Sequence, residues 1–542
     1  MKYPLIRYAV ASAIAAASVG VAHATDIATF NTSGRTNVVV YISGSTAVDN
    51  TLASIVQNSL CQADTLSTYI SQVTFAGGGS ETLYYCQAGT GSGLPTSDYL
   101  AVEKESTTGS VHGAEPLINV SEGAPSGVTF FDPTQGTAID AANCTNDGST
   151  TSNDCPTSVF ISNVTPTGGV ADVEAKLLRS VPGGAVLPAA AIGDDLVAAP
   201  GLDVVWGIAV TKNLYRALQQ AEGLNTGTCA TTPDVPQCVP SLSKEQVASI
   251  LVYSDFGNTN LTFWNQVLDL PANPVDENIY LCRRDVGSGT EASFEAYFLG
   301  ARCADATNGS DLHMATQDGQ YVIESGSNGG IRTCLEAFYN HNNTITITPY
   351  NSDLGTDFPP VTPTGDQWAI GILSSEETAS NLTGSNDSWR LVAIDGVLPT
   401  LENVVNGFYP YFSTDAWYHY KSGLAYPSSA ALGVFNTIQA DVGSPSVLAT
   451  ADATYKNQPW GDGGDLSPAS EYAKDATYTA FPVTQAEVEA NPINLWSKAA
   501  GGSVNNCETP TLFNSGVSGA GEPSGNTVTE GLLLGSGNVN KQ

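Results

Sequence analysis

Short β-branched runs and helical patterns alternate along most of the chain. The first run, residues 38–42, ends in a Gly-Ser turn at 43–45, and a helix-like stretch follows over 47–60. The alternation returns later, with strand-like runs at 204–210, 278–282, 321–324, 368–373 and 389–394 and helical patterns at 214–221, 242–252, 291–299 and 331–339. Strands that alternate with helices are typical of an α/β protein with mainly parallel sheets, and we predict that class.

Two stretches lack this alternation. Residues 86–170 are rich in Gly, Ser, Thr, Asn and Pro, which predicts an elaborated loop region with short strands. From about residue 426 onward the chain is turn-rich and weak in pattern, and residues 514–542 form a Gly/Ser/Asn-rich tail. No internal repeat is visible, so the sequence does not indicate a repeat architecture.

The first 24 residues have the pattern of a secretory signal peptide. Lys2 and Arg7 supply a positive start, an Ala-rich apolar run covers 8–21, and Ala22-His23-Ala24 forms an A-x-A cleavage site. A membrane anchor is the alternative, but the run is short for a bilayer and no later stretch is long and apolar enough to span one. We therefore expect an exported protein, periplasmic or secreted.

The cysteines agree with export. All ten follow the signal peptide, and an even number in an exported chain predicts disulfides. Proximity in the sequence suggests three pairs: Cys144–Cys155, Cys229–Cys238 and Cys61–Cys86. The other four allow three pairings: Cys282, Cys303, Cys334 and Cys507. There is no CxxC motif and the five His residues do not cluster with Cys, so the sequence favours neither a metal site nor a cofactor.

Charge limits the partners. The chain carries 53 Asp and Glu against 19 Lys and Arg, a formal net charge of −34, although only 13% of its residues are charged. Such a chain argues against nucleic acid and anionic membranes as partners, and we expect a monomer. Fields from exposed carboxylates are screened beyond about 10 Å at ordinary salt, so a few fixed donors can still bind an anion at contact distance.

The densest chemical signal joins a predicted strand to a predicted helix. Its members are two arginines, two glycines that allow close approach, and two hydroxyls: Arg283, Arg284, Gly287, Ser288, Gly289 and Thr290. A helix start offers unpaired N–H groups and a partial positive charge, and a guanidinium can bind two oxygens at once. An ordinary helix cap is the alternative, but it does not explain the two arginines in so arginine-poor a chain.

Other hydroxyl-rich turns could face the same site. The first, Ser43-Gly44-Ser45-Thr46, ends the first strand and opens the first helix. The second is Ser106-Thr107-Thr108-Gly109-Ser110, and Gly77-Gly78-Gly79-Ser80 competes with it. Each pattern is weak alone and also fits a capping turn. Their co-occurrence favours an anion site that includes Ser45, Thr46, Ser106 and Thr107.

These motifs, in this order, resemble those of the periplasmic phosphate-binding proteins of ABC transporters, a PstS-like family of type II periplasmic binding proteins. The resemblance covers residues 37 to 425. The site motifs are Ile42-Ser43-Gly44-Ser45-Thr46, Ser106-Thr107-Thr108-Gly109, Gly169-Val170-Ala171-Asp172, and the R-x-x-x-S-G-T signature at Arg284, Ser288, Gly289 and Thr290. Segments 206–210, 242–247, 263–266 and 367–371 resemble the family's framework.

The resemblance implies two α/β lobes joined by a hinge. We expect the first lobe to comprise residues 25–203 plus 376–542 and the second to comprise residues 204–375. The first would contribute Thr46, Ser106 and Asp172 to the site, and the second Arg284, Ser288, Gly289 and Thr290. Inorganic phosphate, or a similar tetrahedral oxyanion, would bridge the lobes as they close. An ABC transporter permease would be the partner.

Under this resemblance, Asp172 would determine which anions the site prefers. A carboxylate can accept a hydrogen bond only from an anion that keeps a proton, as hydrogen phosphate does and sulfate does not. A surface carboxylate is the alternative for Asp172. Two departures from the family pattern are Glu105, a negative charge beside the Ser106 turn, and the region after 425, which has no counterpart.

An enzyme is not indicated. Ser288 lies in V-G-S-G-T and not in the G-x-S-x-G of a nucleophile elbow. A secreted phosphatase usually needs metal ligands, and no His/Asp cluster offers them. The third alternative is a surface or matrix protein that keeps the fold without an uptake role, and the acidic surface and the unmatched C-terminal region favour it.

Overall fold

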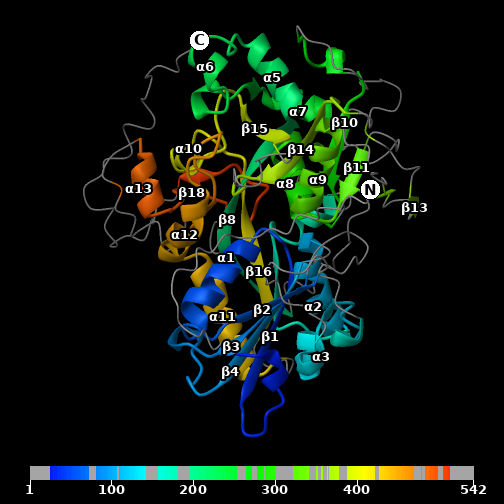
Figure 1. The fold of residues 1–542 in the computed structure, drawn as a ribbon, viewed down its shortest axis with the longest axis vertical. Coiled ribbons are helices and arrows are strands. Elements are labelled where there is room, and N and C mark those ends of the chain that lie inside the picture. The colour runs from blue at the N-terminus through cyan, green and yellow to red at the C-terminus, as the bar shows by residue number, and fades with distance from the viewer. Residues whose placement is uncertain are drawn as a thin grey trace, which may run out of the picture.

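The computed structural model describes residues 25–71, 81–106, 109–141, 157–180, 195–252, 264–270, 277–285, 287–300, 322–340, 350–351, 356–357, 363, 365–377, 387–421, 427–468, 478, 482–498 and 504–512. Two lobes lie one above the other in Figure 1, and long strands connect them along the middle. One sheet of 13 strands runs through both lobes in the described residues, with the main order β11-β10-β14-β8-β16-β7-β1-β4-β3-β2. The predicted α/β class with two lobes is confirmed.

The first lobe, lower in Figure 1, is built around β1 (Asn37–Gly44). It pairs in parallel with β4 (Tyr99–Glu105) and β7 (Gly168–Ala171), while β3 (Glu81–Gln87) and β2 (Ser67–Ser71) extend the edge in antiparallel fashion. Helices cover this sheet at α1 (Asp49–Ile55), α2 (Glu115–Ser121), α3 (Gly136–Ala141) and α11 (Ser429–Val442). Because parallel strands end at the same edge, the loops after β1, β4 and β7 meet there.

The strand β8 (Leu196–Thr211) crosses from one lobe to the other. Its first part, up to Val205, pairs with β16 (Phe412–Tyr420) in the first lobe, and its second part, from Trp206, pairs with β14 (Ala369–Ser374) in the second. After β14 the chain adds β15 (Trp389–Ile394) to the second lobe before it returns along β16. The boundaries of the lobes stay a prediction: β8 crosses at Val205, next to the expected start of the second lobe at 204, whereas β15 pairs within the second lobe although 376–542 was expected in the first.

The second lobe repeats the parallel arrangement. β10 (Tyr280–Arg284) lies between β11 (Val322–Ser325) and β14, parallel to both. The described residues of this lobe form the helices α5 (Lys212–Ala221), α6 (Thr228–Thr231), α7 (Lys244–Leu251), α8 (Gly289–Leu299), α9 (Asn328–Tyr339) and α10 (Leu401–Val405). α7 begins with a capping box between Ser243 and Gln246.

The C-terminal segment, meaning the described residues from 427 to 512, touches both lobes. It contains α11, α12 (Pro445–Ala451), β17 (Asp465–Leu466), α13 (Gln485–Ala490), β18 (Trp496–Ser497) and β19 (Thr511–Leu512). α11 packs on β1 and β8, β17 pairs with β8, and α13 packs on α10. The prediction of a pattern-poor tail was wrong for α11, because its apolar residues recur at helical spacing: Ala431, Val434, Phe435, Ile438 and Val442.

Buried hydrogen bonds hold the C-terminal segment against the region where β8 crosses between the lobes. Asn494 donates from Nδ2 to Asp203 Oδ2 on β8 at 2.6 Å. The Val483 N–H donates to Asn406 Oδ1, beyond α10, at 2.7 Å. Asn506 donates from Nδ2 to Glu174 Oε2, beyond β7, at 2.8 Å. The segment therefore bridges the two lobes across the crossing strands.

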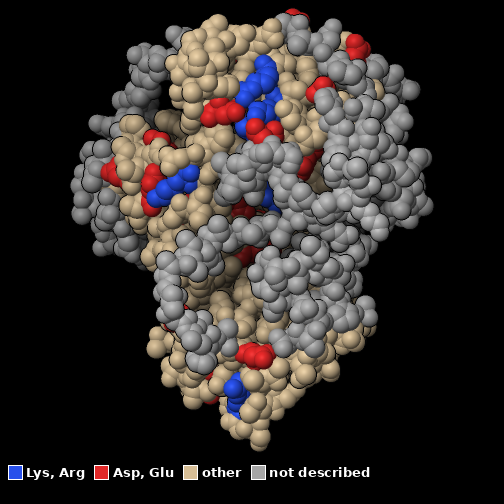
Figure 2. All heavy atoms as spheres, viewed as in Figure 1, with Lys and Arg blue, Asp and Glu red and all other residues tan. Residues whose placement is uncertain are grey.

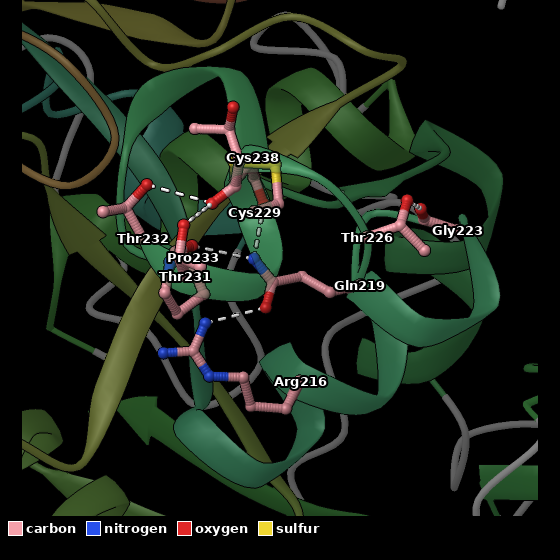
Figure 3. Close-up of a disulfide and its surroundings, with 10 residues drawn as sticks. Arg216, Gln219, Gly223, Thr226, Cys229, Thr231, Thr232, Pro233 and Cys238 are labelled. Atoms are coloured by element: carbon pink, nitrogen blue, oxygen red, sulfur yellow. Dashed lines mark hydrogen bonds between the residues drawn. A yellow bond between two sulfur atoms is a disulfide. The ribbon is translucent and has the colours of Figure 1, made fainter.

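Three disulfides lie among the described residues. Cys61–Cys86 and Cys229–Cys238 confirm two predicted pairs, and Cys282–Cys334 settles one pairing that the sequence left open. Figure 3 shows Cys229–Cys238 closing a loop beside Gln219, whose Nε2 donates to the Cys238 carbonyl at 2.6 Å. The predicted pair Cys144–Cys155 and the predicted signal peptide lie outside the described residues. No helix in the part of the chain that the structure describes could span a membrane.

Candidate functional site

Three loops of the first lobe meet at the carboxyl ends of β1, β4 and β7. The chain turns at Gly44 with φ +109°, a conformation that favours glycine. A Cβ added there would also lie 2.7 Å from Gly113 Cα, in the turn after β4. The Ser45 N–H donates to the Val170 carbonyl on β7 at 2.8 Å. This close approach of three backbones brings Ser45 and the residues after β7 together.

Asp172 is the centre of this junction. Its carboxylate is 3% exposed, Ser45 donates to its Oδ1, and Ser110 donates to its Oδ2 at 2.9 Å. The Ser110 hydroxyl also accepts from the Asp172 N–H at 3.1 Å. Burial raises the pKa of Asp172, while Ser45, Arg284, Ser110 and Lys104 act against that rise. The predicted residues Ser45 and Asp172 therefore lie together, in a dry environment.

The second lobe meets Asp172 through the start of α8. A Cβ added at Gly289, the first residue of the helix, would lie 2.5 Å from Ser110 Oγ and 2.7 Å from Asp172 Cβ. The Val111 N–H of the first lobe donates to the Gly287 carbonyl of the second at 2.9 Å. The positive end of a helix thus lies against the first lobe's carboxylate and hydroxyls, with no room for a side chain between them.

Arg284 lies beside this contact, at the end of β10. It is 3% exposed, and a Cβ added at Gly109 would lie 3.5 Å from its Nη2. Its guanidinium donates to the Ser325 carbonyl at 3.2 Å, the Gly326 carbonyl at 2.7 Å and Asn328 Oδ1 at 3.0 Å. A guanidinium has five N–H groups, so two remain unengaged among the described residues.

The hydroxyls of α8 divide between two roles. Ser288 caps the helix, because its Oγ accepts from the Thr290 N–H at 3.2 Å. That is the ordinary cap that the sequence offered as an alternative. Thr290 is 1% exposed, and its Oγ1 has no hydrogen-bond partner within the described ranges. A buried hydroxyl without a partner is costly, so Thr290 is the α8 side chain best suited to a ligand oxygen.

The other predicted residues lie near this centre but do not bond to Asp172. Ser106 donates to Asp49 Oδ1 at 3.0 Å and accepts from Lys104 Nζ at 2.7 Å. Thr46 is half-buried and its carbonyl accepts from the Asp49 N–H at 3.2 Å. Thr107 lies outside the described residues.

Sequence reasoning missed Ser110 and Lys104. Ser110 closes the same hydroxyl-rich turn as Ser106, so the turn was found but not the residue in it that reaches Asp172. Lys104 stands at the end of β4 and is 2% exposed. The available signal was a lysine between two glutamates immediately before that turn, in a chain with few cations.

Several lysines and arginines outside this site lie in small groups with acidic side chains. Figure 2 shows lysine and arginine lying beside acidic side chains on the face viewed. One such group in the second lobe joins Lys212, Arg216 and Arg390 to Asp234 and Asp387. No group of three metal-ligating side chains occurs in the ranges that the structure describes.

No protein-family model matches the sequence, and no curated protein matches it. Among solved structures, the chain is similar to an ABC-type phosphate transport receptor from Vibrio cholerae, with 14% identity, 74% of this chain and 93% of that chain covered, and a TM-score of 0.32. The chain is also similar to a putative phosphate ABC transporter substrate-binding protein from Clostridium perfringens, solved with bound phosphate. The identity is 14%, the match covers 77% of this chain and 97% of that chain, and the TM-score is 0.35. For PstS from Borrelia burgdorferi the identity is 13%, the match covers 76% of this chain and 97% of that chain, and the TM-score is 0.30. With TM-scores this low, fold and site rest on this chain's own strand order and contacts.

Proposed function

We propose that this chain is an exported solute-binding protein that holds inorganic phosphate, or a similar tetrahedral oxyanion, between its lobes for uptake by an ABC transporter. One observation carries the proposal. The start of α8 in the second lobe lies against the hydroxyls and carboxylate of the first lobe at Gly289. Proteins bind oxyanions at such helix starts because unpaired N–H groups and the helix dipole both favour negative charge.

The donors suit an anion with several oxygens. The hydroxyls of Ser45 and Ser110 come from the first lobe, and the Thr290 hydroxyl and two N–H groups of Arg284 come from the second. All four side chains are at least nine-tenths buried, so an anion among them would exchange water for fixed donors. An anion that bridges both lobes would stabilise their closed arrangement relative to an open one.

Asp172 would make the site prefer an anion that carries a proton. Hydrogen phosphate can donate to the carboxylate, whereas sulfate would place oxygens against it with no proton between them. An unpaired buried polar group costs about 1–3 kcal/mol, and a charged one costs more. The same carboxylate that would repel sulfate would therefore bind hydrogen phosphate.

A surface or matrix protein that keeps the fold without an uptake role is the second candidate. The C-terminal segment favours it, because it bonds to both lobes through Asn494, Asn406 and Asn506. A transport receptor has to open in order to release its ligand, and these bonds oppose opening. The two candidates differ in how fast a bound anion would exchange.

Calorimetric titration of residues 25–542 with phosphate, arsenate and sulfate tests the proposal. We expect phosphate and arsenate to bind and sulfate to bind more weakly. Absence of binding by every one of these anions would contradict the oxyanion site. Release of labelled phosphate within seconds would favour the uptake role, and much slower release would favour the second candidate. Turnover of a simple phosphate ester would instead indicate a phosphatase.

A further inference from the structure

Lys104 is a buried cation on the first lobe's side of the site. It is 2% exposed, although lysine is among the residue types least often buried. Its Nζ donates to the Gly44 carbonyl at 2.8 Å, the Glu105 carbonyl at 2.7 Å and Ser106 Oγ at 2.7 Å. An ammonium group has three protons, so all are engaged. The ammonium therefore has one fixed position among the loops that build the site.

These bonds hold the peptide that presents Ser45. The Gly44 carbonyl, which Lys104 binds, belongs to the same peptide unit as the Ser45 N–H, which donates to the Val170 carbonyl at 2.8 Å. On the other side, the Gly44 N–H donates to Glu105 Oε2 at 3.3 Å. The turn thus lies between an ammonium and a carboxylate, and it directs the Ser45 hydroxyl to Asp172.

The charge of Lys104 also acts on Asp172. Burial raises the pKa of Asp172, and the positive charge of Lys104 is among the interactions that oppose this rise. Asp49 offsets part of that charge, because its Oδ1 lies 3.4 Å from Nζ, but its side chain is 33% exposed and therefore partly screened by solvent. The ammonium favours Asp172 as a charged acceptor.

We propose that Lys104 is a positioning residue that sets the selectivity of the site, because it fixes the Ser45 turn and keeps Asp172 an acceptor for a protonated anion. This inference rests on the proposed function. Without Lys104, Asp172 would more readily hold its own proton and could donate to sulfate. Discrimination between hydrogen phosphate and sulfate would then narrow, even where the fold is intact.

The test compares two buried lysines. Lys104→Met and Lys498→Met each remove a buried ammonium; Lys498 is 5% exposed and donates to the Phe412 carbonyl at the crossing strands. We expect both variants to lose thermal stability, but only Lys104→Met to narrow the phosphate-to-sulfate affinity ratio, by roughly tenfold. In a double variant, adding Lys104→Met to Asp172→Asn should change the phosphate-to-sulfate affinity ratio little, because the carboxylate on which Lys104 acts is already gone.

The outcomes distinguish a failure of the proposed function from a failure of the Lys104 inference alone. If the wild-type chain binds neither anion, the proposed function fails and the role of Lys104 fails with it. If the wild type discriminates and Lys104→Met weakens both anions equally, only the Lys104 inference is wrong. If Lys104→Met does not fold, Asp49→Asn provides the test instead. It removes the negative charge that partly offsets the Lys104 ammonium, and the Asp49 side chain is partly exposed, so the substitution should be tolerated. We expect that variant to keep or widen the ratio, and a narrower ratio would overturn the inference.

Discussion

Gly289→Ala tests the contact between the lobes directly. The added methyl would lie 2.5 Å from Ser110 Oγ, 2.7 Å from Asp172 Cβ and 3.0 Å from Asp172 Oδ2, closer than carbon and oxygen atoms tolerate. The backbone itself accepts alanine, since Gly289 is not at positive φ and begins a helix. Overpacking of this kind costs about 1–3 kcal/mol. Because lobes that open would escape the clash, the cost falls on the closed, anion-bound state.

At 1.4 kcal/mol per tenfold, that cost predicts a phosphate affinity about 5- to 150-fold lower. Calorimetry measures the affinity, and thermal unfolding without phosphate should show a smaller effect. Gly329→Ala is the matched control, because Gly329 also lies in the first turn of a helix in the second lobe and its added Cβ would meet nothing closer than 3.6 Å. Unchanged phosphate affinity in Gly289→Ala would show that the bound state does not contain this contact, and the site as built would be wrong.

Three further outcomes are expected. Asp172→Asn should narrow phosphate-over-sulfate discrimination in competition titrations, and unchanged competition by sulfate would refute its acceptor role. Burial, with Glu377 nearby, raises the pKa of Glu376 to about 8. The folded state therefore keeps a proton that the unfolded chain releases near 4.5, so stability should fall as pH rises between these values. Urea midpoints should show a flatter pH profile in Glu376→Gln, and an unchanged profile would contradict this assignment. Asn494→Ala removes the amide that donates to buried Asp203, so the free energy of unfolding should fall by about 1–3 kcal/mol in urea titrations. A decrease in unfolding free energy smaller than the experimental error would mean that the Asn494–Asp203 hydrogen bond does not stabilise the region where β8 crosses between the lobes.

The parts of the fold that sequence predicted are those fixed by local chemistry. The helix expected over 242–252 is α7, and Ser243, a residue type common at helix starts, caps it. The β-branched run at 38–42 lies within β1, and its Gly-Ser turn needs the positive φ that Gly44 has. In such segments, periodicity and turn or capping residues indicate the element, although β1 still needs its pairing with β4 and β7 to form.

The parts that sequence did not predict depend on distant contacts. Ser106 and Ser110 belong to one turn, and only the close approach of β7 at Val170 decides which of them reaches Asp172. A lysine at the end of a strand usually lies in solvent, so nothing local distinguished Lys104 as buried. The path of β15 back into the second lobe likewise follows from its pairing with β8 and not from its own pattern.

The bonds to Asp172 also explain how an acidic chain could discriminate among anions. In the described structure the Ser45 and Ser110 hydroxyls both donate to its carboxylate. Under the proposed function, an anion that takes these donors leaves Asp172 without them, at about 1–3 kcal/mol for each buried acceptor left unpaired. Hydrogen phosphate can return one bond by donating its own proton, whereas sulfate can return none. Selectivity would then arise because Asp172 loses the two hydroxyl donors to any bound anion and regains a bond only from one that carries a proton, so the negative charge at the centre of the site serves discrimination among anions.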